Sequence, residues 1–99
     1  MLAAIQPAET VAKEMIPTLR FPQEDVLATP ELRRLRRFDA DRACALGNND
    51  HGKLDIYFKT ADNELKRVQT TVWAAHETYL TLKAGMTIPL SAVVGFDFY

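Results

Sequence analysis

Hydrophobic and polar residues alternate through much of the second half of the chain. Leu54, Ile56 and Phe58 occupy every second position, and the same two-residue period returns between Val68 and Val72. This period is typical of a β-strand that buries one of its faces. Together with the later apolar segments it predicts five strands separated by short turns, at about 53–60, 65–75, 79–83, 86–90 and 93–98.

Five short strands at this spacing favour a small antiparallel barrel, because closure removes the exposed edges of an open sheet. A strongly curled sheet capped by helices fits the same pattern. Gly85, in the turn before the fourth strand, is expected to have a positive φ. Pro89 cannot donate a ladder hydrogen bond, so we expect it at an edge or a break of the sheet.

The N-terminal part of the chain predicts a short helix and an irregular arm. Pro7 can open a helix that ends near Ile16, because Pro17 disfavours the helical conformation of the residue before it. Residues 17–29 are then expected to form an ordered but irregular connection.

A longer helix is predicted over 30–46. Thr29 can accept hydrogen bonds from the free N–H groups of the first turn, and Pro30 suits the first helical position. Gly47 is expected to end the helix, followed by a turn over 48–52. The apolar positions of this helix share one broad face, formed by Leu32, Leu35, Phe38, Ala43 and Leu46.

The whole chain is predicted to be one α+β domain, mainly β, with three parts: the arm 1–29, the helix 30–46 and the barrel 53–99. A formal net charge of −1 creates no overall field that would attract nucleic acid or an anionic membrane. Cys44 is the single cysteine, so no intrachain disulfide is expected. The sequence shows neither a signal peptide nor an apolar run of about 18 residues, which predicts a cytoplasmic protein without membrane contact.

The strand alternation also predicts an aromatic outer surface. If Ile56, Val72, Leu82 and Phe96 point inward, four aromatic side chains point outward: Tyr57, Trp73, Tyr79 and Tyr99. In one interpretation the apolar face of the 30–46 helix covers them. In the other they form an interface with a second subunit or a ligand, since exposed aromatic patches often mark contact sites.

Candidate chemistry is sparse. The sequence lacks the common nucleophile, zinc-hydrolase and phosphate-loop motifs, so we predict no catalytic residue, metal or cofactor. An enzyme would need a site shared between subunits and built on His51 or Cys44. Asp55 and Asp97 lie on outward positions of different strands, where they form either a carboxylate pair or two surface acids.

The basic positions of the 30–46 helix are the remaining candidate site. Arg33, Arg34, Arg36 and Arg37, with Lys53 and His51 beyond the predicted helix, could contact the phosphates of a nucleic acid. The alternative is a solvated helix face, because acidic residues dilute the positive charge.

The stretch Asp55–Phe98 resembles the Sm-like fold, an SH3-type small barrel of a helix and five strands whose members form RNA-binding rings. The resemblance is clearest at Ile88–Val94, which is similar to the second Sm motif of the bacterial RNA-chaperone branch. It implies the barrel but not the RNA site. The glycine of the family's second strand falls on Gln69 or Thr70, the acidic position after it falls on Ala75 or His76, and the lysine–histidine pair falls on Thr87–Ile88.

Residues 30–98 also resemble small bacterial proteins for which we know no activity. The shared elements are Leu46-Gly47-Asn48, Thr70-Thr71-Val72-Trp73 and the segment from Leu82 to Pro89. Three hypotheses follow from the sequence. The first is a non-enzymatic binding or structural module that forms a homo-oligomer or binds another protein. The others are an Sm-like RNA-binding protein that uses the basic helix, and an enzyme with a site at a subunit interface.

Overall fold

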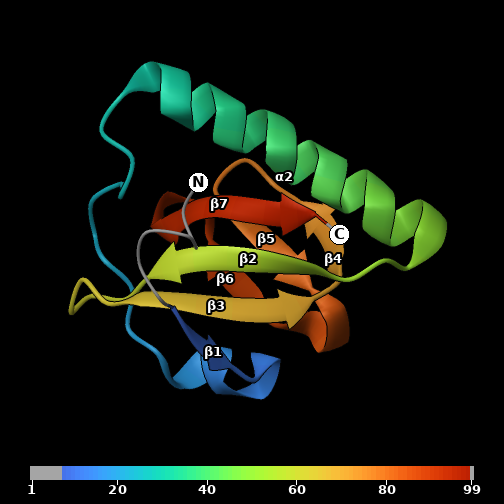
Figure 1. The fold of residues 1–99 in the computed structure, drawn as a ribbon, viewed down its shortest axis with the longest axis horizontal. Helices are drawn as coiled ribbons and strands as arrows, with labels where there is room; N and C mark the ends of the chain where they lie inside the picture. The colour runs from blue at the N-terminus through green and yellow to red at the C-terminus, as the bar shows by residue number, and fades with distance from the viewer. Residues whose placement is uncertain (1–7, 99) are drawn as a thin grey trace.

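Two β-sheets and one long helix form the fold of residues 8–98, the part of the chain that the computed structural model describes (Figure 1). The larger sheet has the strand order β1-β3-β2-β7, and the smaller sheet has the order β4-β5-β6. The bounds of the strands are Glu9–Val11 (β1), Leu54–Lys59 (β2), Leu65–Thr70 (β3), Val72–Ala75 (β4), Tyr79–Leu82 (β5), Thr87–Pro89 (β6) and Val93–Phe98 (β7). The helix α2 covers Pro30–Asp50, and three short 3-10 helices are η1 (Lys13–Thr18), η2 (Lys83–Gly85) and η3 (Leu90–Ala92).

The α+β class with mainly sheet is confirmed, whereas the five-stranded closed barrel is wrong for the described residues, which form seven strands in two sheets. The strand expected over 65–75 is divided at Thr71. Its first part, β3, pairs antiparallel with β2, and its second part, β4, pairs antiparallel with β5. Thr70, Thr71 and Val72 are all buried, so burial does not alternate at the division. The hydrophobic pattern of the sequence continues through it and contains no sign of it.

The N-terminal helix expected up to Ile16 is also wrong. Residues Glu9–Val11 form the strand β1, which pairs in parallel with β3 at one edge of the larger sheet. A 3-10 helix, η1, follows and includes Pro17; its one buried residue, Ile16, is 1% exposed and joins the core. The expected helix start at Pro7 lies outside the described residues. Glu9 bonds to Lys66 and Thr10 accepts from Arg67, so contacts with β3 favour a strand there.

Aliphatic side chains from both sheets pack into one core. Ile56, Val72 and Leu82 are fully buried, as the alternation predicts, and Phe96 is partly buried against the same cluster. Gly85 has a φ of 84°, which confirms its role in the turn. Pro89 lies in β6, at an edge of the smaller sheet, where its missing N–H does not interrupt a ladder.

The helix α2 packs on the strands β4 and β7 through an unexpected face (Figure 1). Its buried positions are spaced four, three and four residues apart and are Arg36, Ala40, Ala43 and Gly47. A Cβ on Gly47 would lie 2.0 Å from the carbonyl oxygen of Val72, so this glycine lets the helix approach β4 directly. The helix therefore continues through residues 48–50, where we expected a turn, and His51 ends it in the left-handed region with a φ of 54°.

The predicted inner face of this helix is largely exposed. Leu32, Leu35 and Phe38 have exposed fractions of 47%, 56% and 62%, so they do not cover the aromatic residues of the sheets. Ala43 is the one residue of the predicted face that is fully buried, and with Ala40 and Gly47 it allows close packing on the strands. Arg36 can be buried among them because its guanidinium bonds to Asp25 and to the carbonyl of Val93.

Candidate functional site

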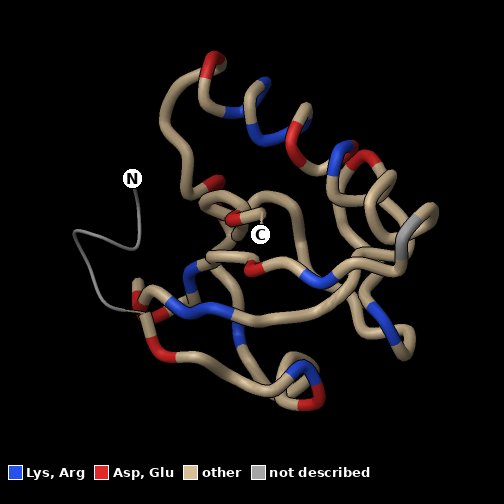
Figure 2. Tube along the Cα trace, turned by 45° about the vertical axis from the view of Figure 1, so that its right-hand side comes forward, with Lys and Arg blue, Asp and Glu red and all other residues tan. Residues whose placement is uncertain are grey.

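The predicted phosphate-binding residues do not form one cluster. Arg33 donates to the carbonyl of Leu27 at 2.9 Å and lies 3.5 Å from an Asp25 oxygen. Arg37 donates to Asp41 at 2.8 Å and to the carbonyl of His76, in the turn between β4 and β5, at 2.7 Å. Acidic and basic positions also alternate along the helix (Figure 2). Arg34 is exposed, and a helical rise of about 1.5 Å per residue leaves it roughly 24 Å from the end of α2, beyond which Lys53 lies.

The prediction that Arg36 contacts phosphates is wrong, because its side chain is buried and has partners within the protein. Its guanidinium binds both Asp25 oxygens, at 2.8 and 2.6 Å, and donates to the carbonyl of Val93 at 3.0 Å. The Arg36 side chain is 6% exposed and that of Asp25 is 18% exposed. Hydrogen bonds from Arg36 hold the pKa of the Asp25 carboxyl below its usual value, against the opposing effect of burial. The pair joins the connection before α2 to the helix and to β7. The signal in the sequence was the spacing of Arg36 with the small residues of the buried face.

The predicted aromatic surface is only partly present. Trp73 and Tyr79 are 47% and 40% exposed, as expected, but Tyr57 is 2% exposed, so it is not part of an exposed aromatic surface. Tyr57 lies in the centre of β2, between Arg67 of β3 and Gly95 of β7, where the sheet continues on both sides. Tyr99 lies outside the described residues. Tyr79 stacks on His76 with ring centroids 4.2 Å apart, so only part of its ring faces solvent.

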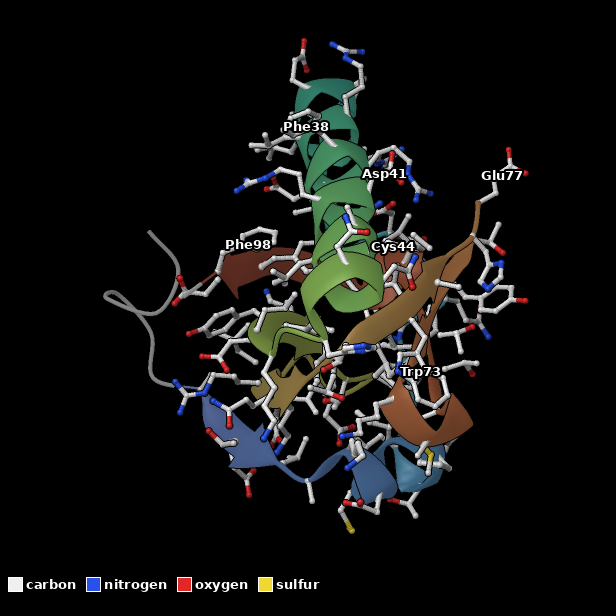
Figure 3. The ribbon with its side chains drawn as sticks, turned by 90° about the vertical axis from the view of Figure 1, so that its right-hand side faces the viewer. Phe38, Asp41, Cys44, Trp73, Glu77 and Phe98 are labelled. Atoms are coloured by element: carbon white, nitrogen blue, oxygen red, sulfur yellow. The ribbon has the colours of Figure 1, made fainter. Side chains whose placement is uncertain are left out.

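Trp73 borders a depression between the C-terminal end of α2 and the smaller sheet (Figure 3). The depression has a volume of about 510 Å³ and is lined by Gly47, Asn48, His51, Thr71, Trp73 and Lys83. Cys44 lies beside it: the thiol is 3.8 Å from the carbonyl oxygen of Trp73 and 3.5 Å from the Asn48 amide nitrogen. The tertiary structure thus brings together residues from three separate segments that the sequence did not group.

Asp55 and Asp97 are direct partners in the register of β2 and β7, so their strands do place the two residues side by side. Asp55 is 8% exposed, which excludes the alternative of two solvated surface acids.

A second surface lies along the outer face of α2. A stripe of positions spaced four, three and four residues apart consists of Glu31, Leu35, Phe38 and Arg42, all exposed; we call it the outer stripe. Arg42 pairs with Asp39 at 3.3 Å and lies over the ring of Phe98, 4.2 Å from its centroid. Phe38 and Phe98 lie on one side of the helix, and Cys44 lies on the other (Figure 3). The apolar part of the outer stripe therefore continues onto the edge strand β7.

Neither a metal centre nor a membrane span is found in residues 8–98. No group of three or more His, Cys, Asp or Glu side chains described by the structure could hold a metal ion. In the same part of the chain, no helix combines the length and the apolar character needed to cross a membrane.

Comparisons with models of protein families, with curated proteins and with solved structures give no match, so similarity assigns the chain neither a family nor an activity.

Proposed function

We propose that this chain is a non-enzymatic module that self-associates, with two copies packing α2 against α2 along the outer stripe. The observation that carries the proposal is the exposure of Leu35 and Phe38, at 56% and 62%, in the middle of a well-formed helix. Burying a large apolar side chain completely is worth about 1.5–3 kcal/mol. Neighbouring apolar residues exposed on one helix face therefore favour association.

The charges of the outer stripe support a second copy in the antiparallel orientation as the partner. Glu31 and Arg42 lie at opposite ends of the stripe, and Leu35 and Phe38 lie between them. A two-fold axis midway between Leu35 and Phe38 places each Glu31 opposite Arg42 of the second copy, and each Leu35 opposite Phe38. Opposite charges meet at both ends in this arrangement, whereas a parallel pair would place like charges opposite each other.

The strand β7 widens the proposed interface. Arg42 lies over Phe98, so a helix that contacts Arg42 also approaches the ring of Phe98 at the edge of the larger sheet. A standard interface buries about 800 Å² per partner, roughly 13% of the 6020 Å² accessible surface of this chain. Because the stripe offers only two central apolar residues per copy, we expect a dissociation constant of roughly 1–100 µM.

The solution mass across the micromolar range tests the proposal, for example by sedimentation equilibrium. Phe38→Glu is expected to shift the equilibrium to the monomer, whereas Met15→Glu, the same type of change at a residue 50% exposed on η1, is expected to leave it unchanged. A mass that stays monomeric at all concentrations, or that Phe38→Glu does not change, would contradict the proposal.

A charge exchange tests the antiparallel orientation. Glu31→Arg and Arg42→Glu are each expected to weaken association, because each places like charges opposite each other. The double variant restores opposite charges and is expected to regain most of the affinity. If the double variant is as weak as the single variants, the arrangement is wrong even if a dimer forms.

The same samples separate the other hypotheses. The resemblance of residues 55–98 to the Sm-like fold adds the expectation of a ring, which has a larger mass than a dimer. The absorbance ratio at 260 and 280 nm reports bound RNA, which stays a prediction for the basic positions of α2.

A further inference from the structure

The depression at the end of α2 has the size and composition of a small-molecule site. Its volume of about 510 Å³ falls within the roughly 300–1,000 Å³ that is usual for ligand pockets. The C-terminal turns of α2 contribute Gly47 and Asn48, and the helix cap contributes His51. The other wall comes from Thr71, between β3 and β4, from Trp73 and from Lys83.

Lys83 gives the described lining of the depression a positive charge. Lys83 is exposed, and the ion pairs among the described residues do not include it; none of the six lining residues is acidic. The amide of Asn48 and the imidazole of His51 add groups that can donate or accept hydrogen bonds. These groups suit an anion more than a cation.

Trp73 gives the site a flat apolar wall. In the pairing of β4 with β5, Val72 lies opposite Leu82 and Ala74 lies opposite Thr81, so Trp73 is the additional residue of a bulge. Bulges change the direction of a side chain and are frequent beside functional sites. The indole remains 47% exposed although the strand that carries it packs under α2. An exposed indole face is a good surface for an aromatic ring.

Two unfavourable backbone conformations border the same depression. His51 has a φ of 54°, and Ala84, the neighbour of Lys83, has a φ of 70°. Residues with a Cβ are disfavoured in this region, and glycine would relieve the cost in both turns. Conformations of this kind concentrate at ligand sites, where they hold side chains in position.

The helix end limits the charge of the ligand. The C-terminus of a helix carries a partial negative charge, which disfavours a doubly charged phosphate at this position. Lys83 provides one full positive charge, which matches a single carboxylate. We propose that this depression binds a small aromatic carboxylate, with its ring on Trp73, its carboxylate on Lys83, and hydrogen bonds from His51 and Asn48.

The binding experiment uses the single tryptophan of the chain as its reporter. Benzoate is expected to change the fluorescence of Trp73 in a saturable way. Benzamide, which lacks the charge, and cyclohexanecarboxylate, which lacks the aromatic ring, are each expected to bind at least several-fold more weakly. Lys83→Gln is expected to weaken benzoate about tenfold, because it removes a charged hydrogen bond. Arg34→Gln, a matched loss of one charge at the far end of α2, is expected to leave binding unchanged.

Backbone amide shifts of the residues around Lys83 locate the ligand independently of fluorescence. The proposal is overturned if benzoate causes no saturable change up to about 10 mM, where a ligand with a Kd near 1 mM would approach saturation. It is equally overturned if benzamide binds as well as benzoate, or if inorganic phosphate binds more tightly than benzoate. If Lys83→Gln and Arg34→Gln bind benzoate with the same affinity, the ligand binds elsewhere on the chain and the proposal is wrong.

Discussion

Replacement of Asp25 by asparagine tests the contact that joins the irregular connection to the helix. The change keeps the shape of the side chain but removes the charge that faces Arg36, whose side chain is 6% exposed. Removal of one partner from a buried ion pair costs about 3–5 kcal/mol. Because Asp25 is 18% exposed and Arg36 keeps its hydrogen bond to the carbonyl of Val93, we expect a smaller loss of about 2–3 kcal/mol.

This loss is large for a domain of 99 residues, whose total stability is about 5–15 kcal/mol. A loss of 1 kcal/mol lowers the Tm of such a domain by about 4–8 °C, so the variant should melt roughly 10–20 °C below the parent chain. Urea unfolding followed by circular dichroism and by Trp73 fluorescence measures the free energy directly. Asp41→Asn is the control, because it removes the carboxylate of an exposed ion pair with Arg37 and should cost less than about 1 kcal/mol.

The pH dependence of the stability difference between the parent chain and Asp25→Asn gives a second test. The hydrogen bonds from Arg36 lower the pKa of Asp25 in the folded state below its unfolded value of about 3.9. The ionised carboxylate therefore contributes stability at pH values above about 4, and this contribution disappears as the pH falls through the folded pKa. The parent chain and Asp25→Asn should converge in stability below that range. A difference under about 0.5 kcal/mol at pH 7, or one that persists unchanged in strong acid, would refute the reasoning.

Three further substitutions test the packing and the end of α2 by urea unfolding. Gly47→Ala should lower the free energy of unfolding by more than about 2 kcal/mol, because the new Cβ would lie 2.0 Å from the carbonyl oxygen of Val72. This loss is expected although alanine favours helices. A variant more stable than the parent chain would show that the helix does not touch β4. His51→Gly should stabilise by about 0.5–1 kcal/mol, since glycine adopts a φ of 54° without strain, and any loss of stability would contradict the left-handed cap. Phe38→Ser should change the stability of the monomer, measured at low protein concentration, by less than about 0.5 kcal/mol. A loss of about 3 kcal/mol, typical of a core residue, would show that Phe38 is buried as first expected from the sequence.

Local signals in the sequence were sufficient for several elements. The alternation around Ile56 and Leu82 identified two strands and the burial of these two residues, because neighbouring positions of a strand point to opposite sides whatever the strand pairs with. The start of α2 at Pro30 was visible because the Thr29 hydroxyl accepts from the N–H of Leu32, three residues away. Gly85 was identified for the same reason, as a tight turn constrains its own residues.

The position of the helix depended on contacts distant in sequence. Hydrophobicity alone favoured the face with Leu35 and Phe38, and it gave no reason to bury Arg36. The structure reverses this choice because Asp25, eleven residues away, and the carbonyl of Val93 at the far end of the chain accept hydrogen bonds from the two terminal nitrogens of the guanidinium. The interface that we propose exists only because of this reversal.

The sequence by itself determined the start of α2 and the extended segments after residue 53, because those preferences arise within a few residues. It did not determine the N-terminal segment, where pairing with β3 makes Glu9–Val11 a strand. Only the tertiary structure decided that the extended segment divides at Thr71, that Tyr57 is buried, and that Asn48, Trp73 and Lys83 surround one depression. The physical reason is that alternation determines the side to which a residue points. It does not determine what lies on that side, which depends on segments that meet only when the chain has folded.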